Sequence, residues 1–229
     1  MSILTDTDLK TLICSDIEWK DRNKIHIYPF SGDCLTPVGY DLRIGNRYSS
    51  AFKRGSFEIK EGDQIAICPG DTTLITTLEK VGMPQNRTIS ALIVSKVSKV
   101  SKGLSHISTS IDPDWDGKLL IVIHNHSRET LNLNFAEPFC TVVFFENKSP
   151  STKDCGKPPE RSDILLKEWS DVTQKVQRKE WIKSLVPIGI IVIMGGSGYL
   201  VFGNQPGFIA MTAIGVGLSQ IASLIIKKY

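Results

Sequence analysis

The chain has few cysteines for its length, and their spacing excludes the usual cysteine frameworks. Five cysteines are spread over 229 residues, with no Cys-x-x-Cys pair and none beside a histidine. An odd, scattered set predicts neither a disulfide-rich domain nor a zinc site. The first ten residues also lack a basic stretch followed by an apolar one. We therefore expect no cleaved secretory signal and a cytosolic N-terminal domain.

Charge is absent from one long apolar segment. Residues 184 to 226 contain no Asp, Glu, Lys or Arg over 43 positions. Because a helix needs about 20 apolar residues to cross a bilayer, this segment is long enough for two spans. The intervening GNQPG favours a tight reversal. We predict a membrane module of residues 183 to 229 whose two helices cover about residues 184 to 202 and 208 to 226.

The charges around this hairpin predict its orientation. Residues 148 to 229 carry a net charge of +5, whereas residues 1 to 147 carry −2. Basic residues flank both ends of the hairpin and none lies in its turn, so both termini are expected in the cytoplasm, at a bacterial inner membrane. The hairpin either anchors the protein among the lipids or assembles with copies and breaches the bilayer. Small residues such as Gly215 and the polar Gln220 suit close helix packing.

The N-terminal two thirds have the pattern of a β domain. Thr5 and Asp8 form a capping-box pattern ahead of a short helix. From residue 24 to 147, brief apolar runs alternate with Gly, Pro, Asn and Asp, which is typical of an antiparallel barrel or sandwich. Residues 148 to 162 are polar with three prolines and predict a linker. Residues 163 to 182 predict a helix, either amphipathic or a self-associating stalk, whose apolar seam is Leu165, Trp169, Val172 and Val176.

Several stretches of residues 1 to 147 resemble the dCTP deaminase and trimeric dUTPase superfamily. They are ILTDTDLK, CLTPVGYDLRIGN, PGDTTLITTLEKVGMP, SIDPDWDGKLLIVIHN and FCTVVFFE. The resemblance implies a distorted β-barrel that forms a homotrimer or a higher oligomer, with nucleotide sites between subunits. The expected fold class is mainly β, namely a dUTPase-like barrel with a short N-terminal helix, then a linker helix and a C-terminal α-helical transmembrane hairpin.

The resemblance also assigns roles to single residues. Asp41 matches a motif-one aspartate near the phosphates, and Ser98 matches a phosphate-binding serine. Asp112 matches the aspartate that contacts the sugar, and Trp115 stands at the aromatic position of the same motif. Around Ser98, the segment VSKVSKVSKG repeats Val-Ser-Lys three times, and its hydroxyl, amide and ammonium groups suit a phosphate. The repeat adds Ser95, Lys96, Lys99, Ser101 and Lys102 to the predicted nucleotide site, although lysines at this period also occur on a solvated helix face.

Other positions depart from the family pattern. The deaminase general acid and base is a glutamate, and here its place is held by Val122, whose alkyl side chain cannot transfer a proton. Glu137 and Val142 replace a glycine and a glutamine near the phosphates of dUTPases, and a carboxylate there repels a triphosphate unless a metal intervenes. The glycine-rich C-terminal lid is missing, and residues 103 to 112 are shorter than the base-reading hairpin. We therefore assign no catalytic residue.

No metal site is predicted from the sequence. His106, His124 and His126 lack a carboxylate pattern that completes a ligand set, so they are interpreted as surface or packing residues. The aspartates at positions 112, 114 and 116 begin like a calcium loop, but its twelfth position is Ile123, which excludes calcium. Mg²⁺ is expected only as the companion of a bound triphosphate. Nucleic acid is not an expected partner.

Three functions are compatible with these features. The first is a non-catalytic sensor of a nucleotide or cyclic nucleotide that controls the membrane hairpin, as in a bacterial antiphage effector. The second is a membrane-tethered hydrolase or deaminase acting on dUTP or dCTP. The third is a membrane scaffold with a vestigial cleft. Asp41, Ser98 and Asp112 favour the second function, whereas Val122, Glu137 and Val142 count against it.

Overall fold

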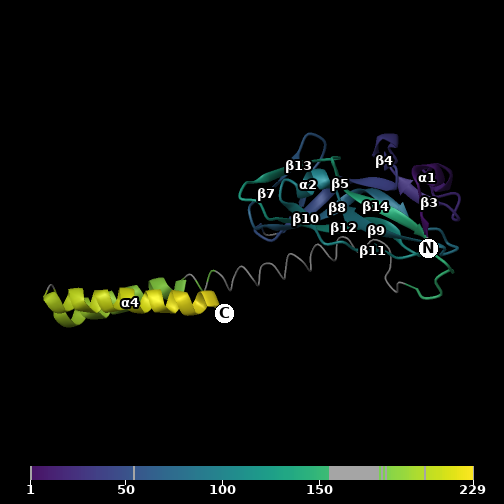
Figure 1. Ribbon diagram of the computed structural model, residues 1–229. Helices are drawn as coiled ribbons and strands as arrows, with labels where there is room; N and C mark the ends of the chain where they lie inside the picture. Colours follow the sequence, from purple (N-terminus) through teal and green to yellow (C-terminus); the bar gives the residue numbers. More distant parts are fainter. Residues whose placement is uncertain are drawn as a thin grey trace. The chain divides into compact units, whose positions relative to one another are not determined.

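The computed structural model describes residues 2–53, 55–154, 181, 183, 185–203 and 205–228 (Figure 1). The chain divides into two compact units, Met1–Asp171 and Val172–Tyr229. The predicted helix at 163 to 182, apart from Trp181, and the linker beyond residue 154 lie outside the described residues. The domain boundaries therefore stay predictions.

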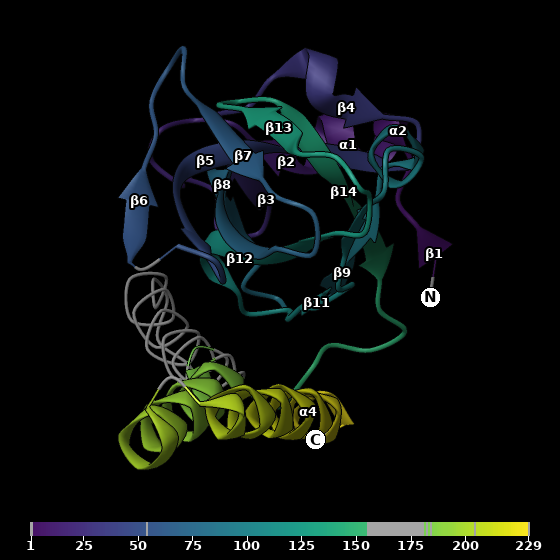
Figure 2. The ribbon, with the colours of Figure 1, turned by 90° about the vertical axis from the view of Figure 1, so that its left-hand side faces the viewer.

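The first unit is a strongly curved, mainly antiparallel sheet in which, among the described strands, only the short β2 pairs in parallel, with β3 (Figure 2). Its main path runs β10-β12-β8-β5-β14-β9-β11, and β13 pairs with β7 in a separate ladder. The main path does not close into a ring, so the predicted mainly β fold is confirmed as a distorted barrel. The elements of this unit are β1 Ser2–Ile3, α1 Asp6–Leu12, β2 Ile13–Cys14, β3 Ile25–Tyr28, η1 Gly32–Cys34, β4 Leu35–Thr36, β5 Gly39–Ser50, β6 Ser56–Glu58, β7 Gln64–Ile67, β8 Thr72–Gly82, β9 Ile89–Ser95, α2 Val97–Val100, β10 Leu104–His106, β11 Ser110–Ile111, β12 Asp116–Asn125, β13 Leu131–Asn134 and β14 Pro138–Glu146.

Local sequence signals explain where the elements begin and bend. The capping box that precedes α1 is present, because Asp8 accepts hydrogen bonds from the backbone N–H and the hydroxyl of Thr5. Strand β12 alternates between half-buried and buried side chains, as a strand with one core face does. At Gly45 a Cβ would lie 2.5 Å from the carbonyl oxygen of Thr76, so only glycine permits this approach of β5 to β8.

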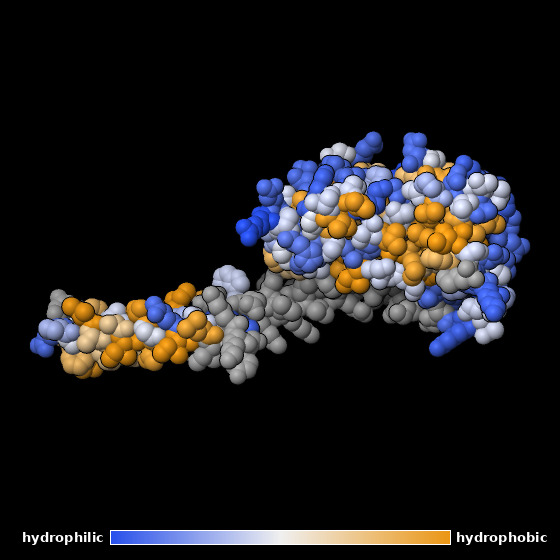
Figure 3. Space-filling view, viewed as in Figure 1, coloured by the Kyte–Doolittle hydropathy of each residue, from blue (hydrophilic) through white to orange (hydrophobic). Residues whose placement is uncertain are grey.

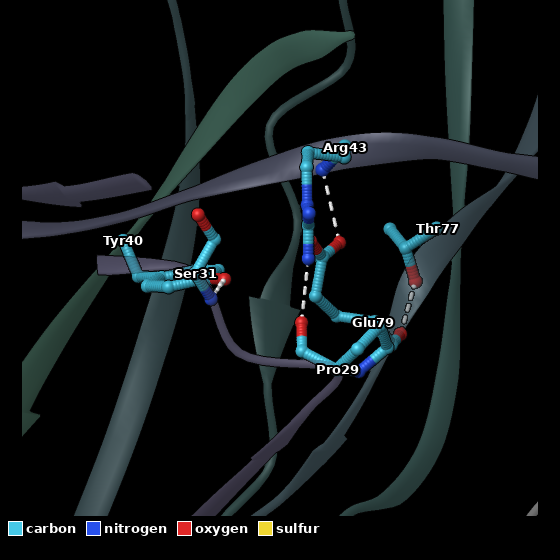
Figure 4. A network of polar contacts seen from close by, with 6 residues as sticks. All are labelled: Pro29, Ser31, Tyr40, Arg43, Thr77 and Glu79. Atoms are coloured by element: carbon cyan, nitrogen blue, oxygen red, sulfur yellow. Dashed lines mark hydrogen bonds and ion pairs between the residues drawn. The ribbon is translucent and has the colours of Figure 1, made fainter. Parts of the chain in front are cut away.

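A buried ion pair joins β5 to β8 in the barrel core (Figure 4). Arg43 donates to the Glu79 carboxylate through its backbone N–H at 2.9 Å and through its guanidinium Nε at 2.5 Å. The guanidinium also donates to the carbonyl oxygen of Pro29. The Glu79 side chain is fully buried and that of Arg43 is 17% exposed. The pair therefore fixes the segment after β3 against two central strands.

The second unit contains two apolar helices. Residues Leu185–Phe202 and Pro206–Leu224, the latter within α4 (Pro206–Lys228), are long and apolar enough to cross a membrane. Figure 3 shows the mainly apolar surface of this unit. The two helices pack in an antiparallel register, since a Cβ on Gly198 would meet Met211 and a Cβ on Gly215 would meet Met194. This packing is that of the predicted hairpin.

Removal of the Glu79 carboxylate is expected to destabilise the β domain strongly. Glu79→Ala leaves the Arg43 guanidinium without its carboxylate in the core, and breaking a buried pair from one side costs about 3–5 kcal/mol. Urea unfolding of the full chain in detergent, followed by near-ultraviolet circular dichroism, measures this loss. Glu58→Ala is the matched control, because Glu58 is 69% exposed in its pair with Arg47 and exposed pairs contribute little. Equal stabilities of the two variants would contradict the prediction.

Candidate functional site

The Val-Ser-Lys repeat forms the end of β9 and a single helical turn. Lys96 precedes α2, and its carbonyl oxygen accepts the backbone N–H groups of Lys99 and Val100. The turn ends at Gly103, whose φ of +88° and contact with Ser127 both exclude a Cβ. The chain then enters β10. The repeat therefore presents its lysines from a tight turn between β9 and β10. We call residues 96 to 103 the lysine turn.

Lys96 pairs with the carboxylate of Asp41. Asp41 lies on β5 opposite Thr141 of β14, and the Thr141 hydroxyl donates to its Oδ1 at 2.6 Å. The side chains of Asp41 and Lys96 are 9% and 24% exposed. Two of the predicted site residues that are 55 positions apart are thus in direct contact.

Lys99 pairs in the same way with Glu137. The other carboxylate oxygen of Glu137 accepts the backbone N–H of Asn134 at 2.9 Å and its side-chain amide at 3.1 Å. Partial burial by itself would raise the pKa of Glu137, but the hydrogen bonds from Lys99 and Asn134 outweigh burial and lower it. Glu137 is therefore ionised at neutral pH.

The remaining predicted residues fall into two groups. Ser98, Ser101 and Lys102 are exposed around α2, while Ser95 forms a 2.6 Å hydrogen bond with His106 Nδ1. Asp112 and Trp115 lie on the turn between β11 and β12 instead, where Asp112 is exposed. Trp115 packs partly against the core and donates its indole N–H to Gly117. Among the described residues, no hydrogen bond or ion pair links this turn to the lysine turn.

A pocket of about 340 Å³ opens beside the lysine turn. The rings of His124 and His126 are 4.2 Å apart in it; His124 hydrogen-bonds the Thr72 hydroxyl at 2.8 Å, and His126 that of Ser105 at 2.8 Å. The lining residues are Thr72, Ser105, His106, Ile107, Val122, His124 and His126. These histidines were not predicted to bind a ligand. The two-residue spacing of Val122, His124 and His126, which places them on one face of a strand, was the signal available in the sequence.

A second, much narrower pocket adjoins the first. Its volume is about 10 Å³, and it shares Ser105 and His106 with the wide pocket. Its lining residues are Ser95, Lys96, Lys99, Leu104, Ser105, His106, Ile123 and Phe139. We call the two shared residues, Ser105 and His106, the junction of the pockets, because they line both the wide pocket and the narrow pocket that contains the paired lysines.

The described part of the chain holds no group of three or more His, Cys, Asp and Glu side chains that could bind a metal ion. Asp41 and Glu137 are both engaged by lysines, so a resident Mg²⁺ does not fit them. Asp116 likewise pairs with Lys80 at 3.1 Å and with Arg22 at 3.5 Å instead of forming a calcium loop.

The fold is that of a known class of nucleotide enzymes. The solved 2'-deoxycytidine 5'-triphosphate deaminase of Agrobacterium tumefaciens superposes with a TM-score of 0.50 at 14% identity, covering 62% of this chain and 48% of that one. A sequence model of the dCTP deaminase-like family matches residues 3–147. The chain therefore belongs to the dCTP deaminase-like family.

Individual relatives agree with this assignment. The dCTP deaminase of Pyrococcus horikoshii is 34% identical over 134 residues, which are 58% of this chain and 83% of the relative. A probable deoxyuridine 5'-triphosphate nucleotidohydrolase of Sulfolobus islandicus rod-shaped virus 1 is 30% identical over 165 residues, 72% of this chain and 97% of the relative. The Pyrococcus match covers 58% of the chain, about the share that the family model matches.

The Glu137 pair is expected to stabilise the protein only when the carboxylate is charged. Because its pKa is lowered on folding, the stabilisation is complete above the ordinary glutamate pKa of about 4.3 and is lost as the pH falls through the folded value. The difference in free energy of unfolding between the wild type and Glu137→Gln, measured in urea from about pH 7 to about pH 3, should shrink toward zero at the acid end. A difference that grows on acidification would contradict this assignment, and the exposed Glu61→Gln serves as the control.

Proposed function

We propose that the β domain is a non-catalytic sensor of a nucleotide or cyclic nucleotide. The observation that carries this proposal is a pocket of ligand size whose wall holds Val122 where the family resemblance places the deaminase general acid and base. No carboxylate is among its lining residues. A pocket of ligand size with an alkyl side chain at that position favours binding over turnover.

The polar groups of the pocket support recognition of a heterocyclic ligand. Imidazole and hydroxyl groups supply hydrogen-bond donors and acceptors on one side, while Val122 and Ile107 supply apolar contact. A few convergent polar groups in a mostly apolar wall are the usual composition of a small-molecule site. The names of the relatives, dCTP deaminase and probable deoxyuridine 5'-triphosphate nucleotidohydrolase, point to nucleotides as the ligand class.

The hairpin supports a membrane effector as the output of the sensor. Gly215 and Ser219 are buried against the partner helix, but Gln220 is exposed. A polar side chain directed at lipid is costly, so its exposure favours assembly of several hairpins. Ligand binding can drive such assembly only if the ligand prefers one arrangement of the subunits. We place this effector in a bacterial inner membrane with both termini in the cytoplasm and assign it to antiphage defence.

An apolar strip on the barrel surface supports self-association of the β domain. Leu92 and Val94 of β9 are 40% and 37% exposed, and Ile3 of β1 is 51% exposed. Strand pairing places Val143 beside Leu92 and Phe145 beside Ile3. Figure 3 shows apolar surface gathered on this domain. Apolar patches on soluble domains mark protein contacts, which agrees with the homotrimer expected from the sequence.

A membrane-tethered deaminase or dUTP hydrolase is the second candidate. Two observations favour it, namely 34% identity to a dCTP deaminase and three histidines among the lining residues of the wide pocket, since histidine is a common general acid and base. Incubation of the purified chain with dCTP or dUTP and Mg²⁺ separates the candidates. The sensor gives no product, whereas turnover that Asp112→Ala abolishes would establish the enzyme.

Lys96→Ala combined with Ser98→Ala is expected to abolish ligand binding while leaving the oligomer intact. The double variant removes an ammonium group and a hydroxyl from the turn proposed to contact phosphate. Thermal-shift and calorimetric titrations with mononucleotides and cyclic nucleotides measure binding, and size-exclusion chromatography in detergent measures assembly. Ser56→Ala with Lys60→Ala, two exposed positions of the same domain, is the matched control. Retained binding would refute the phosphate assignment, and no binding by the wild type would favour the scaffold.

Expression of the chain without its natural control is expected to depolarise bacterial cells, and truncation after residue 182 should remove the effect. The truncation deletes both apolar helices and leaves the β domain complete. A potential-sensitive dye measures depolarisation, and immunoblots establish equal expression. Undiminished toxicity of the truncated chain would exclude the hairpin as the effector.

A further inference from the structure

The lysine turn is electrically compensated by the protein itself. Lys96 is paired with Asp41, and Lys99 with Glu137, so two ammonium charges face two carboxylate charges. All four side chains are at most 29% exposed. The two lysines that line the narrow pocket therefore add little net positive charge to it, and the third lysine of the turn, Lys102, is exposed and lines neither pocket.

Both carboxylates are held in place by contacts other than the lysines. The Thr141 hydroxyl fixes Asp41 across paired strands, and the backbone and side-chain amides of Asn134 fix Glu137. A ligand that drew the lysines away would leave these two carboxylates close to its phosphates. Like charges at short range in a partly buried site repel strongly. Each additional phosphate of a triphosphate adds to this repulsion from the two carboxylates.

The space at the lysine turn is also small. The narrow pocket lined by Lys96 and Lys99 has a volume of about 10 Å³, which is about that of one water-sized probe. The wide pocket of about 340 Å³ has room for a base and a sugar, but neither Lys nor Arg is among its lining residues. Neither pocket therefore offers a chain of phosphates both a large volume and a lysine that is not already paired with a carboxylate.

A single phosphate group at the edge of the wide pocket, next to the paired lysines, is compatible with both the small volume and the paired charges. An ammonium group has three N–H donors, and each lysine has one hydrogen bond to a carboxylate in the described structure. The remaining donors of Lys96 and Lys99 can bind one anionic group at the junction of the two pockets without breaking either ion pair. Ser105 and His106, which line both pockets, adjoin this junction.

We infer that the site selects nucleotides that carry one phosphate group, either a monoester or a cyclic diester, against nucleoside triphosphates. Glu137 is the residue that sets this limit, since it neutralises Lys99 from a fixed position. The inference rests on the proposed nucleotide-binding function and specifies its ligand class. It separates this chain from relatives whose names specify triphosphates as substrates.

Calorimetric titration of the full chain in detergent tests the inference. The probes are the 5'-monophosphate, 3',5'-cyclic monophosphate and 5'-triphosphate of each of the four common bases, with and without Mg²⁺. For at least one base, a single-phosphate form should bind at least about tenfold tighter than the triphosphate, a difference of about 1.4 kcal/mol. Comparison of the affinities for the 5'-monophosphates and the 3',5'-cyclic monophosphates shows whether the site prefers a phosphate monoester or a cyclic diester.

Glu137→Gln should raise the triphosphate affinity about tenfold and so reduce the preference for the single-phosphate nucleotide. Glu61→Gln should leave the affinities for the single-phosphate nucleotide and the triphosphate unchanged. Asp41→Asn provides a second variant with the same expected direction, should Glu137→Gln fold poorly. A wild-type protein that binds the triphosphate most tightly, or carboxylate variants that leave the preference unchanged, would overturn the inference and leave the proposed sensor standing. Absence of binding by every probe would overturn both.

Discussion

The buried Arg43–Glu79 pair is the constraint on which the site depends. It joins β5 to β8 in the core and holds the segment after β3 through Pro29. Strand β5 continues from this pair to Asp41, and β8 continues in the other direction to Thr72. One end of the site and one wall of the pocket therefore belong to strands that share this ionic contact. A buried ion pair adds little net stability compared with an apolar pair of the same size, although removal of one partner is costly. Its main contribution here is to fix the position of the two strands.

Much of the fold could be predicted from the sequence because its signals are local. The capping box at Thr5, the short alternating strands and the uncharged hairpin segment each extend over a few residues and follow from hydrogen-bonding and burial rules. The open path of the sheet was not predictable. It depends on which strands pair at long range, and neither β10 nor β11 contains a signal that its outer edge remains unpaired.

The site was predicted less completely than the fold. The Val-Ser-Lys repeat predicted a cluster of lysines at this turn, but the net charge of the cluster also depends on Asp41 and Glu137, which are 55 and 38 positions away from the lysines they pair with. Only strand register brings those carboxylates to the turn. His124 and His126 are two positions apart at the end of β12, which is a local signal, whereas His106 joins them only because β10 pairs with β12. Spacing along the sequence shows which residues are close in the chain, but the ion pairs of Lys96 and Lys99 form with residues of distant segments.

The glycine contacts of the hairpin have a consequence for ion flow. Met211 lies against the Cα of Gly198, and Met194 lies against that of Gly215, so the two helices touch along their shared face. At these two contacts methionine side chains fill the space between the helices, which interrupts any continuous file of water inside one hairpin. Any conducting path must therefore be walled by helices of different protein copies, and its diameter must depend on how many copies come together.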